Sequence, residues 1–178
     1  MLRIVDMKKR PRLRREVAEL YSEIFKEKPW SENFRPEEVM ILMGKQLDGP
    51  RPEIALAAIK KRKVIGFTWM YEIFNDDLQE GTRYSPDLGF LFKRGKKVFY
   101  LQEVGVEKES RNQGIGEKLI QELLKKGKKQ GASFIVLSTN SKAESAKALF
   151  IKVGFEDSGI VRPPENLGRT YWILELKD

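Results

Sequence analysis

The segment VFYLQEVGV, residues 98–106, followed after four residues by RNQGIG, residues 111–116, decides the fold of this chain. The first part is almost continuously apolar, which is typical of a strand buried on both faces. After the glycines, apolar residues recur at the spacing of one helix face: Ile115, Leu119, Ile120, Leu123 and Leu124. We therefore expect a strand that feeds a helix through a glycine-containing turn.

The turn at residues 111–116 has the chemistry of a phosphate site. A helix N-terminus presents unpaired N–H groups, two glycines allow a diphosphate to approach the backbone, and Arg111 adds a cation. A glycine pair at a helix start also occurs as a simple tight turn. A Walker loop is excluded because Glu117, not Lys, follows Gly116, and a dinucleotide fingerprint is excluded because Leu119 occupies its third small position.

Hydrophobic periodicity predicts a sheet and two helices before this segment. The expected elements are a short strand over 1–6, a helix after the basic stretch 8–15, a helix from Pro36 to about Leu47, and an antiparallel hairpin of strands 53–60 and 63–74. Residues 75–96 have no clear period and predict a long connection with a short strand over 88–92.

After the central helix the pattern predicts a strand, a helix and two final strands. The strand covers residues 134–138. Ser141 and Glu144 have the spacing of a capping box, which predicts a helix that starts there and closes at Gly154. The last strands are expected over 155–161 and 170–176.

Composition bounds the chemistry. A chain of 178 residues predicts one domain over 1–178, and the absence of Cys and His excludes thiol nucleophiles, Ser-His-Asp triads and most transition-metal sites, so no metal is expected. A net charge of +8 favours an anionic partner. The basic cluster at 8–15 lacks interleaved aromatic residues, which disfavours nucleic acid. No apolar run is long enough to cross a membrane and the charged N-terminus has no signal-peptide core, so we expect a cytoplasmic protein.

Two separated motifs resemble the GNAT superfamily of acyl-CoA-dependent N-acyltransferases. RNQGIG resembles the family's Arg/Gln-x-x-Gly-x-Gly/Ala motif, and VGV at 104–106 looks like the strand before it. ALFIKVGF, residues 148–155, is similar to the family's downstream helix and strand. The resemblance implies a single-domain α/β fold with a mixed, mostly antiparallel sheet that is splayed at its centre and flanked by helices.

The resemblance also implies that acetyl-CoA is the acyl donor. Its diphosphate would bind the backbone N–H groups from Asn112 to Glu117, its pantetheine arm would pair with Val104 and Val106, and the N–H of Val104 would polarise the thioester carbonyl. The cofactor-binding residues implied are Val104, Gly105, Val106, Arg111, Asn112, Gln113, Gly114, Ile115, Gly116, Glu117, Asn140 and Phe150.

Catalysis requires a base, because a lysine-like amine holds its proton with a pKa of about 10.4. Glu103 is the first candidate because it lies in an apolar strand where desolvation would raise its pKa, with Glu72 and Gln102 as alternatives. Two positions depart from the family pattern. Phe150 replaces the Tyr that protonates the leaving thiolate in many members, so either the thiolate leaves unprotonated or Tyr100 or Tyr171 substitutes. Ala143 replaces an Asn.

The predicted function is direct transfer of an acetyl group from acetyl-CoA to a primary amine. The sequence leaves the acceptor open among a protein N-terminus, lysine, a polyamine, an amino sugar and an amino acid, and it also leaves a homodimer open. Two other functions stay in view. One is a CoA-binding regulatory module with weak catalysis, suggested by Phe150. The other is a basic nucleic-acid binder, suggested by the net charge.

Overall fold

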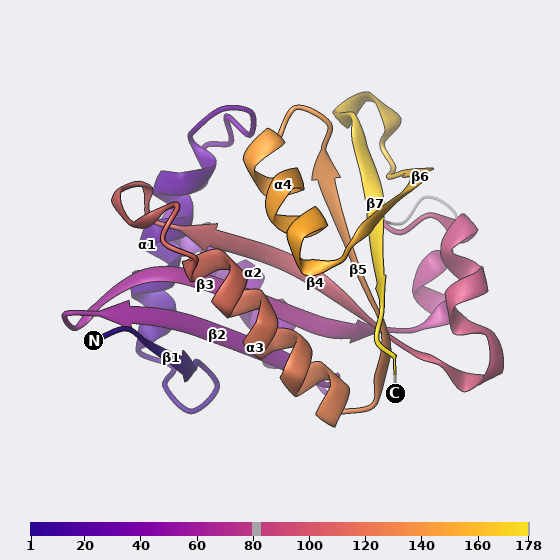
Figure 1. Cartoon of the computed structure of the whole chain (residues 1–178), viewed down its shortest axis with the longest axis horizontal. Coiled ribbons are helices and arrows are strands. Elements are labelled where there is room, and N and C mark those ends of the chain that lie inside the picture. The colour runs from indigo at the N-terminus through magenta and orange to yellow at the C-terminus, as the bar shows by residue number, and fades with distance from the viewer. Residues whose placement is uncertain (80–82, 178) are drawn as a thin grey trace.

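A computed structural model describes residues 1–79 and 83–177 as a central sheet with helices on both faces (Figure 1). The strands are β1 Arg3–Asp6, β2 Glu53–Lys60, β3 Lys63–Ile73, β4 Lys97–Val106, β5 Ala132–Asn140, β6 Glu156–Val161 and β7 Arg169–Glu175. The α-helices are α1 Leu13–Phe25, α2 Pro36–Leu47, α3 Ile115–Lys129 and α4 Glu144–Val153. Short 3-10 helices are η1 Asn75–Leu78, η2 Pro86–Gly95, η3 Lys108–Ser110 and η4 Glu165–Leu167.

The sheet has the order β1-β2-β3-β4-β5-β7-β6 in the described residues. Every neighbouring pair is antiparallel except β4 and β5, which are parallel. These two strands pair only from Lys97 to Tyr100 on β4 and from Ala132 to Val136 on β5. Beyond Tyr100 they separate, so the predicted mixed, mostly antiparallel sheet with a central splay is confirmed.

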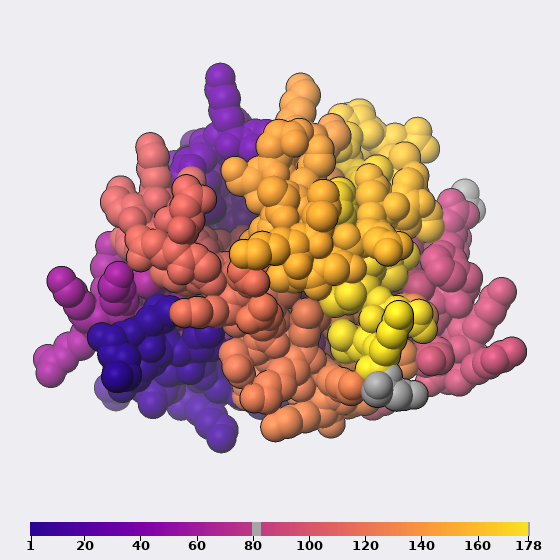
Figure 2. All heavy atoms as spheres, viewed as in Figure 1, coloured from indigo at the N-terminus to yellow at the C-terminus, as the bar shows by residue number. Residues whose placement is uncertain are grey.

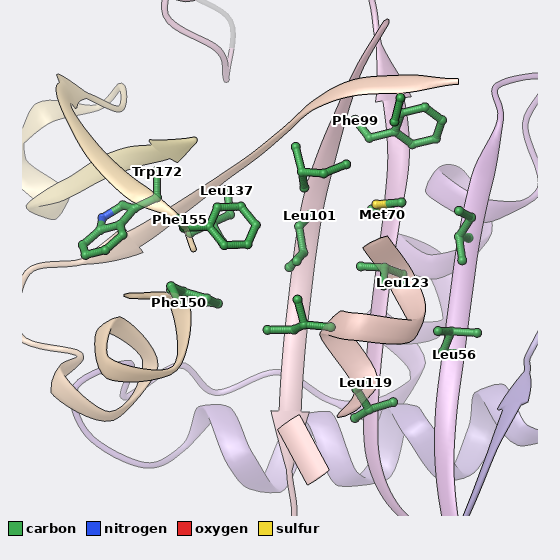
Figure 3. Close-up of a cluster of buried hydrophobic side chains, with 14 of the residues drawn as sticks. Leu56, Met70, Phe99, Leu101, Leu119, Leu123, Leu137, Phe150, Phe155 and Trp172 are labelled. Atoms are coloured by element: carbon green, nitrogen blue, oxygen red, sulfur yellow. The ribbon is translucent and has the colours of Figure 1, made fainter. Parts of the chain in front are cut away.

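Opposite faces of the sheet carry different helices, because alternate residues of each strand point to opposite sides. On one face, α1 and α2 pack over Ala55, Ala57, Phe67 and Trp69. On the other face, α3 and α4 pack over a second cluster that contains Leu101 and is drawn in Figure 3. Figure 2 shows the atoms of α3 and α4 covering this face. Burial of each large apolar side chain contributes about 1.5–3 kcal/mol, so both clusters hold the sheet in place.

The splayed ends of β4 and β5 are supported on the α3 and α4 face by aromatic packing. Phe150 of α4 meets Phe155 edge to face, with ring centroids 5.9 Å apart, and lies 6.5 Å from the ring of Trp172 (Figure 3). Leu119 and Leu123 of α3 pack in the same cluster, and Leu119 lies against Gly66, which is paired with Val106 at the splayed end of β4. The wedge between the strands therefore has rigid walls.

The sequence predictions for the other strands and helices are confirmed, with two corrections. Residues 88–92 form part of η2 and no strand. The predicted capping box is wrong: α4 starts at Glu144 after Ala143, with no side-chain cap. Asn140 Oδ1 instead accepts the N–H of Lys142 at 2.9 Å and shapes the turn itself. The part of the predicted 75–96 connection at 80–82 lies outside the described residues. No helix in the described part of the chain combines the length and apolar character that crossing a bilayer requires.

Candidate active site

A cleft of about 580 Å³ lies where β4 and β5 separate. Its walls come from α1, the connection between α1 and α2, the second half of β4, the end of β5, the start of α4 and the segments around β6 and β7. The predicted residues that line it are Tyr100, Gln102, Glu103, Val104, Gly105, Val106, Arg111, Ala143 and Phe150. The splay of the sheet therefore brings the predicted base and the predicted donor-binding strand into one cavity.

The turn before α3 presents a row of free backbone donors. Asn112 and Gly114 have left-handed backbones, with φ of 58° and 73°, and no side chain caps the helix. Within the described part of the chain, no group accepts a hydrogen bond from any of the six N–H groups from Asn112 to Glu117. Successive N–H groups in such a turn form a concave anion site, strengthened by the helix dipole. This arrangement fits a diphosphate.

The two glycines of the motif serve different purposes. A Cβ on Gly114 would meet no atom within 4 Å, so glycine is favoured there by the positive φ and by the open approach to the backbone. A Cβ on Gly116 would lie 3.1 Å from Cδ2 of Leu149, so glycine there allows α3 to approach α4. Glu117 is neutralised by Lys152 at 2.5 Å, which limits its repulsion of an anion.

Arg111 is tied to the protein. Its Nε donates to the carbonyl oxygen of Val106 at 3.0 Å, and its two terminal nitrogens donate to the carboxylate of Glu27 at 2.7 and 3.0 Å. The guanidinium lowers the pKa of Glu27, so the pair stays charged. Arg111 thus fastens the turn to β4 and to the end of α1, and direct contact with a phosphate stays a prediction.

The edge of β4 that faces β5 is open from Leu101 onwards. The N–H of Glu107 bonds to Ile65 of the β3 side, and alternation then turns the N–H and C=O groups of Val104 and Val106 towards the gap. In β5, the hydroxyl of Thr139 is buried and has no partner among the described residues. The Val106 carbonyl already accepts from Arg111, but the other polar groups on the two sides of the wedge have no partner among the described residues and fit an amide-bearing arm such as pantetheine.

A β-bulge at Gln102 sets the direction of Glu103. In the β3–β4 register, Met70 faces Leu101 and Trp69 faces Glu103, so Gln102 is the extra residue. Gln102 and Glu103 consequently both point to the face of α1 and α2, although they are adjacent in sequence. The sequence left this face undetermined because a bulge reverses the alternation of the strand.

A directed chain of hydrogen bonds orients the Glu103 carboxylate. An indole N–H can only donate, so Trp69 Nε1, at 2.8 Å, fixes Oε1 of Gln46 as the acceptor. Nε2 of Gln46 then donates to Oε1 of Gln102 at 3.1 Å, and Nε2 of Gln102 donates to Oε1 of Glu103 at 3.1 Å. The hydroxyl of Tyr21 donates to the same oxygen at 3.1 Å. Oε1 is fully engaged, whereas Oε2 of Glu103 accepts nothing from the described residues.

Burial raises the pKa of Glu103 to about 7, and the hydrogen bond from Gln102, the charge of Arg83 and the hydrogen bond from Tyr21 oppose this rise. A base works best when its pKa lies near the operating pH, because it is then ionised often enough to act and basic enough to take a proton. Desolvation together with an unpaired Oε2 gives Glu103 the properties of a general base.

The structure shows which of the other predicted bases and acids line the cleft. Glu72 is buried outside the residues that line the cleft, and Gln102 supports Glu103 rather than acting alone. Tyr171 is also absent from the cleft lining, because its hydroxyl donates to the carbonyl of Arg83 at 2.8 Å. Tyr100 lines the cleft, and its hydroxyl lies 2.8 Å from Oγ of Ser138.

The remaining predicted cofactor residues have internal roles in the structure. Asn140 donates to the carbonyl of Leu167 at 3.1 Å and lies outside the cleft lining. Gln113 donates to the carbonyl of Glu109, and Ile115 is buried in the core. A Cβ on Gly105 would lie 2.6 Å from the ring of Phe67, so glycine is needed there for packing. Contact of these residues with a cofactor stays a prediction.

Sequence reasoning missed Gln46, Arg83 and Arg162 in and around the cleft. Gln46 is an ordinary helix residue in the sequence, and Arg83 falls in the aperiodic connection. The net charge of +8 was the one feature of the sequence that favoured a site for an anion, and Arg83 and Arg162 reach the cleft from loops.

A turn with free N–H groups, an open strand edge and a half-buried carboxylate are the features expected of a protein that brings a phosphate-bearing donor to a nucleophile. A family model described as "Acetyltransferase (GNAT) family" matches residues 14–155. The chain belongs to this family. No curated protein sequence matches the chain.

Solved structures share the fold at low sequence identity. Arabidopsis thaliana NAA60, solved with a bisubstrate analogue, has a TM-score of 0.71 at 14% identity, covering 98% of both chains. The PaiA N-acetyltransferase of Thermoplasma acidophilum, solved with coenzyme A, has a TM-score of 0.68 at 14% identity, covering 99% of both chains. The ribosomal-protein-S18-alanine N-acetyltransferase of Escherichia coli has a TM-score of 0.66 at 15% identity, covering 100% of this chain and 96% of that one.

Proposed function

We propose that this protein is an N-acetyltransferase that moves an acetyl group from acetyl-CoA directly to a primary amine. One observation supports the proposal: the cleft lined by Glu103 and the open edge of β4 extends to Arg111, directly before the turn whose N–H groups from Asn112 to Glu117 have no acceptor among the described residues. Direct transfer is favoured because the chain has no Cys to carry an acyl group.

The main chain would hold the donor. The N–H groups from Asn112 to Glu117 would bind the diphosphate, and Val104 and Val106 would pair with the pantetheine amides. When bound, acetyl-CoA supplies the thioester whose acetyl group is transferred. The N–H of Val104 would donate to the acetyl carbonyl oxygen, where negative charge develops.

Glu103 would take the proton of the acceptor amine on Oε2. Removing that proton at pH 7 from an amine of pKa about 10.4 costs about 4.6 kcal/mol, so a positioned base is valuable. Tyr21 and Gln102 hold Oε1 and thereby keep Oε2 directed to the cleft. Glu103 would release the proton to water as the products leave.

Phe150 packs in the wall of the cleft and has no hydroxyl, so it cannot protonate the leaving CoA sulfur. A thiol has a pKa of about 8.5, so a thiolate leaves without protonation. Phe150 also supports the second candidate, a CoA-binding regulatory module with weak catalysis. Tyr100 is the remaining tyrosine candidate, since its hydroxyl lies in the cleft lining.

Release of CoA separates the two candidates. Calorimetry with acetyl-CoA measures binding, and a thiol reagent measures CoA released in the presence of an amine panel, without background because the protein has no Cys. Binding with amine-dependent release supports the enzyme. Binding without release for any amine favours the module, and no binding of acetyl-CoA refutes both.

The nucleic-acid alternative has weaker support in the structure. Within the basic cluster, Lys8 pairs with Glu53, Arg14 with Asp48, and Arg15 with Glu19 and Glu37. Pairing with carboxylates reduces the positive potential that a phosphate backbone would need. A salt-dependent titration with DNA and RNA tests this alternative directly.

A further inference from the structure

Two arginines line the cleft without a carboxylate partner. Among the described residues, no Asp or Glu lies within ion-pair distance of Arg83 or Arg162, and the Nε atom of each is buried without a hydrogen bond. The guanidinium of Arg83 lies over the ring of Tyr100 at 5.1 Å. Arg162 donates from Nη1 to Oγ of Ser138 at 3.0 Å. Both cations are therefore held in place with part of their donor capacity unused.

The other acidic residues of the cleft wall are already paired. Glu27 binds Arg111, Glu32 binds Arg169 at 2.8 Å, and Glu144 binds Lys147 at 3.0 Å. Glu103 alone, among the described acidic residues of the wall, has no ion pair. The uncompensated charge at the centre of the cleft is thus positive, and an anionic ligand group would balance it.

Burying an unpaired guanidinium is costly, and its planar fork matches an oxyanion. A guanidinium that turns two N–H donors towards a ligand binds a carboxylate or phosphate in a bidentate manner, and neither arginine has a carboxylate partner among the described residues. The backbone at Arg83 is fixed for this task, because its carbonyl accepts the Tyr171 hydroxyl, which also accepts the N–H of Ser85 at 3.2 Å.

The donor's diphosphate does not explain these arginines. Its predicted turn follows Val106, whereas Arg83 stacks on Tyr100, and six residues of strand span about 20 Å. Tyr100 also belongs to the cluster on the face opposite α3 and α4, together with Tyr84 and Val136. Arg83 and Glu103 therefore share the α1 and α2 side of the sheet, where an acceptor would enter.

Resting on the proposed function, we propose that the acceptor is a small amine that carries an acidic oxyanion group, bound by Arg83 and Arg162 while its nitrogen faces Glu103. Tyr100 and Ser138 lie between the two arginines and are joined by a 2.8 Å hydrogen bond. In the transfer step, the ammonium group of the acceptor first gives one proton to Glu103. The nitrogen–acetyl bond then forms, the thioester C–S bond breaks, the second nitrogen proton passes to water, and CoA leaves as the thiolate.

The span between the two binding points limits the acceptor. Three residues of strand, about 10 Å, separate Tyr100 from Glu103, and side chains reaching in from both ends shorten the gap. The charge of Arg83 acts on Glu103 and opposes the rise of its pKa, which places the two groups within electrostatic reach. An amine and an acid a few bonds apart, as in amino acids, fit this spacing.

The test compares acceptors that differ only in the acid. Alanine is paired with alaninamide, 4-aminobutanoate with 4-aminobutanamide, and phosphoethanolamine with ethanolamine. CoA release with each acceptor is measured for wild type, Arg83→Gln, Arg83→Lys and Arg162→Gln. Arg10→Gln is the matched control, because Arg10 is exposed and outside the cleft. Binding of each probe in the presence of CoA is measured by calorimetry, which does not depend on turnover, and thermal unfolding checks that each variant folds.

We expect wild type to prefer the acidic member of at least one pair by about tenfold or more in kcat/KM, as for a hydrogen bond to a charged group. Arg83→Gln should remove most of that preference, Arg83→Lys should restore part of it, and Arg10→Gln should keep it. Preference within the carboxylate pairs or within the phosphate pair identifies the source of the oxyanion.

Equal rates and equal binding within all pairs would overturn the proposal while leaving the acetyltransferase intact. Retention of the preference in both Arg83→Gln and Arg162→Gln would equally overturn it. Absence of acetyl-CoA binding would instead refute the proposed function, on which this inference depends.

Discussion

Replacing Glu103 by Gln tests the buried carboxylate through the stability of the fold. Burial raises the pKa of Glu103 from 4.5 to about 7. A carboxyl whose folded pKa is raised binds its proton more tightly in the folded state, so its ionisation opposes folding. Stability should be complete below pH 4.5 and should fall as the pH rises to 7.

The magnitude follows from the shift. Each pKa unit corresponds to about 1.36 kcal/mol, so a rise from 4.5 to about 7 corresponds to about 3 kcal/mol of stability lost by pH 8. Glu103→Gln keeps an acceptor for Tyr21 and Gln102 but cannot ionise. The variant should equal wild type in stability at pH 4 and exceed it by about 3 kcal/mol at pH 8.

Urea unfolding of both proteins at pH 4, 6 and 8 measures this difference. Glu156→Gln is the control for the loss of a carboxylate, because Glu156 is exposed on β6. A difference between wild type and Glu103→Gln that stays constant from pH 4 to pH 8 would refute the argument that desolvation tunes this carboxyl.

Four further outcomes are expected. In wild type, kcat/KM for a lysine-like acceptor should rise through pH 7 and then level off, because Glu103 ionises with a pKa of about 7. The kcat/KM of Glu103→Gln should be lower by about 10²–10⁴-fold at pH 7 and should keep rising with pH. Identical pH profiles would exclude Glu103 as the base. Gly114→Glu should weaken acetyl-CoA binding more than 100-fold in calorimetry, because about 3 kcal/mol of hydrogen bonds to the charged diphosphate is lost. Gly159→Glu is the matched control, because Gly159 also has a positive φ of 70° and open space around it, and its affinity should not change. Equal affinities of the two variants would contradict the phosphate assignment. Gln46→Met should lower the free energy of unfolding in urea by about 1–3 kcal/mol, because the indole N–H of Trp69 loses its acceptor. An unchanged urea midpoint would show that the hydrogen-bond chain contributes nothing to stability. Phe150→Tyr should raise kcat with unchanged acetyl-CoA affinity if the leaving thiolate lacks an acid, and no gain would place protonation elsewhere.

The central fold was predictable because local pattern and global structure agree there. The run at 98–106 is apolar enough to be a buried strand, and the periodic residues after Gly114 form the amphipathic helix α3. The turn between them needs positive φ at Gly114, which the residue type itself indicates. Local chemistry was therefore sufficient to predict the strand, the turn and the helix on which the proposed donor site is built.

The acceptor half was not predictable, because long-range contacts build it. The face of Glu103 depends on a bulge at Gln102 that no residue type marks. Arg83 reaches the cleft from an aperiodic connection, and Glu32 meets Arg169 across 137 positions of sequence. Such pairings come from tertiary packing rather than from propensity.

The bulge and the open edge of β4 would give the donor and the acceptor different kinds of contact: main-chain atoms for the donor and side-chain atoms for the acceptor. In the proposed function, main-chain atoms of β4 would bind the donor, so most replacements of side chains along that edge would leave these contacts with the thioester unchanged. Side chains would bind the acceptor, so a single replacement of Arg83 or Arg162 would change which amine is accepted. A mutational scan that spares the glycines should therefore find the donor half of the cavity tolerant of replacement and the acceptor half changed in its choice of amine.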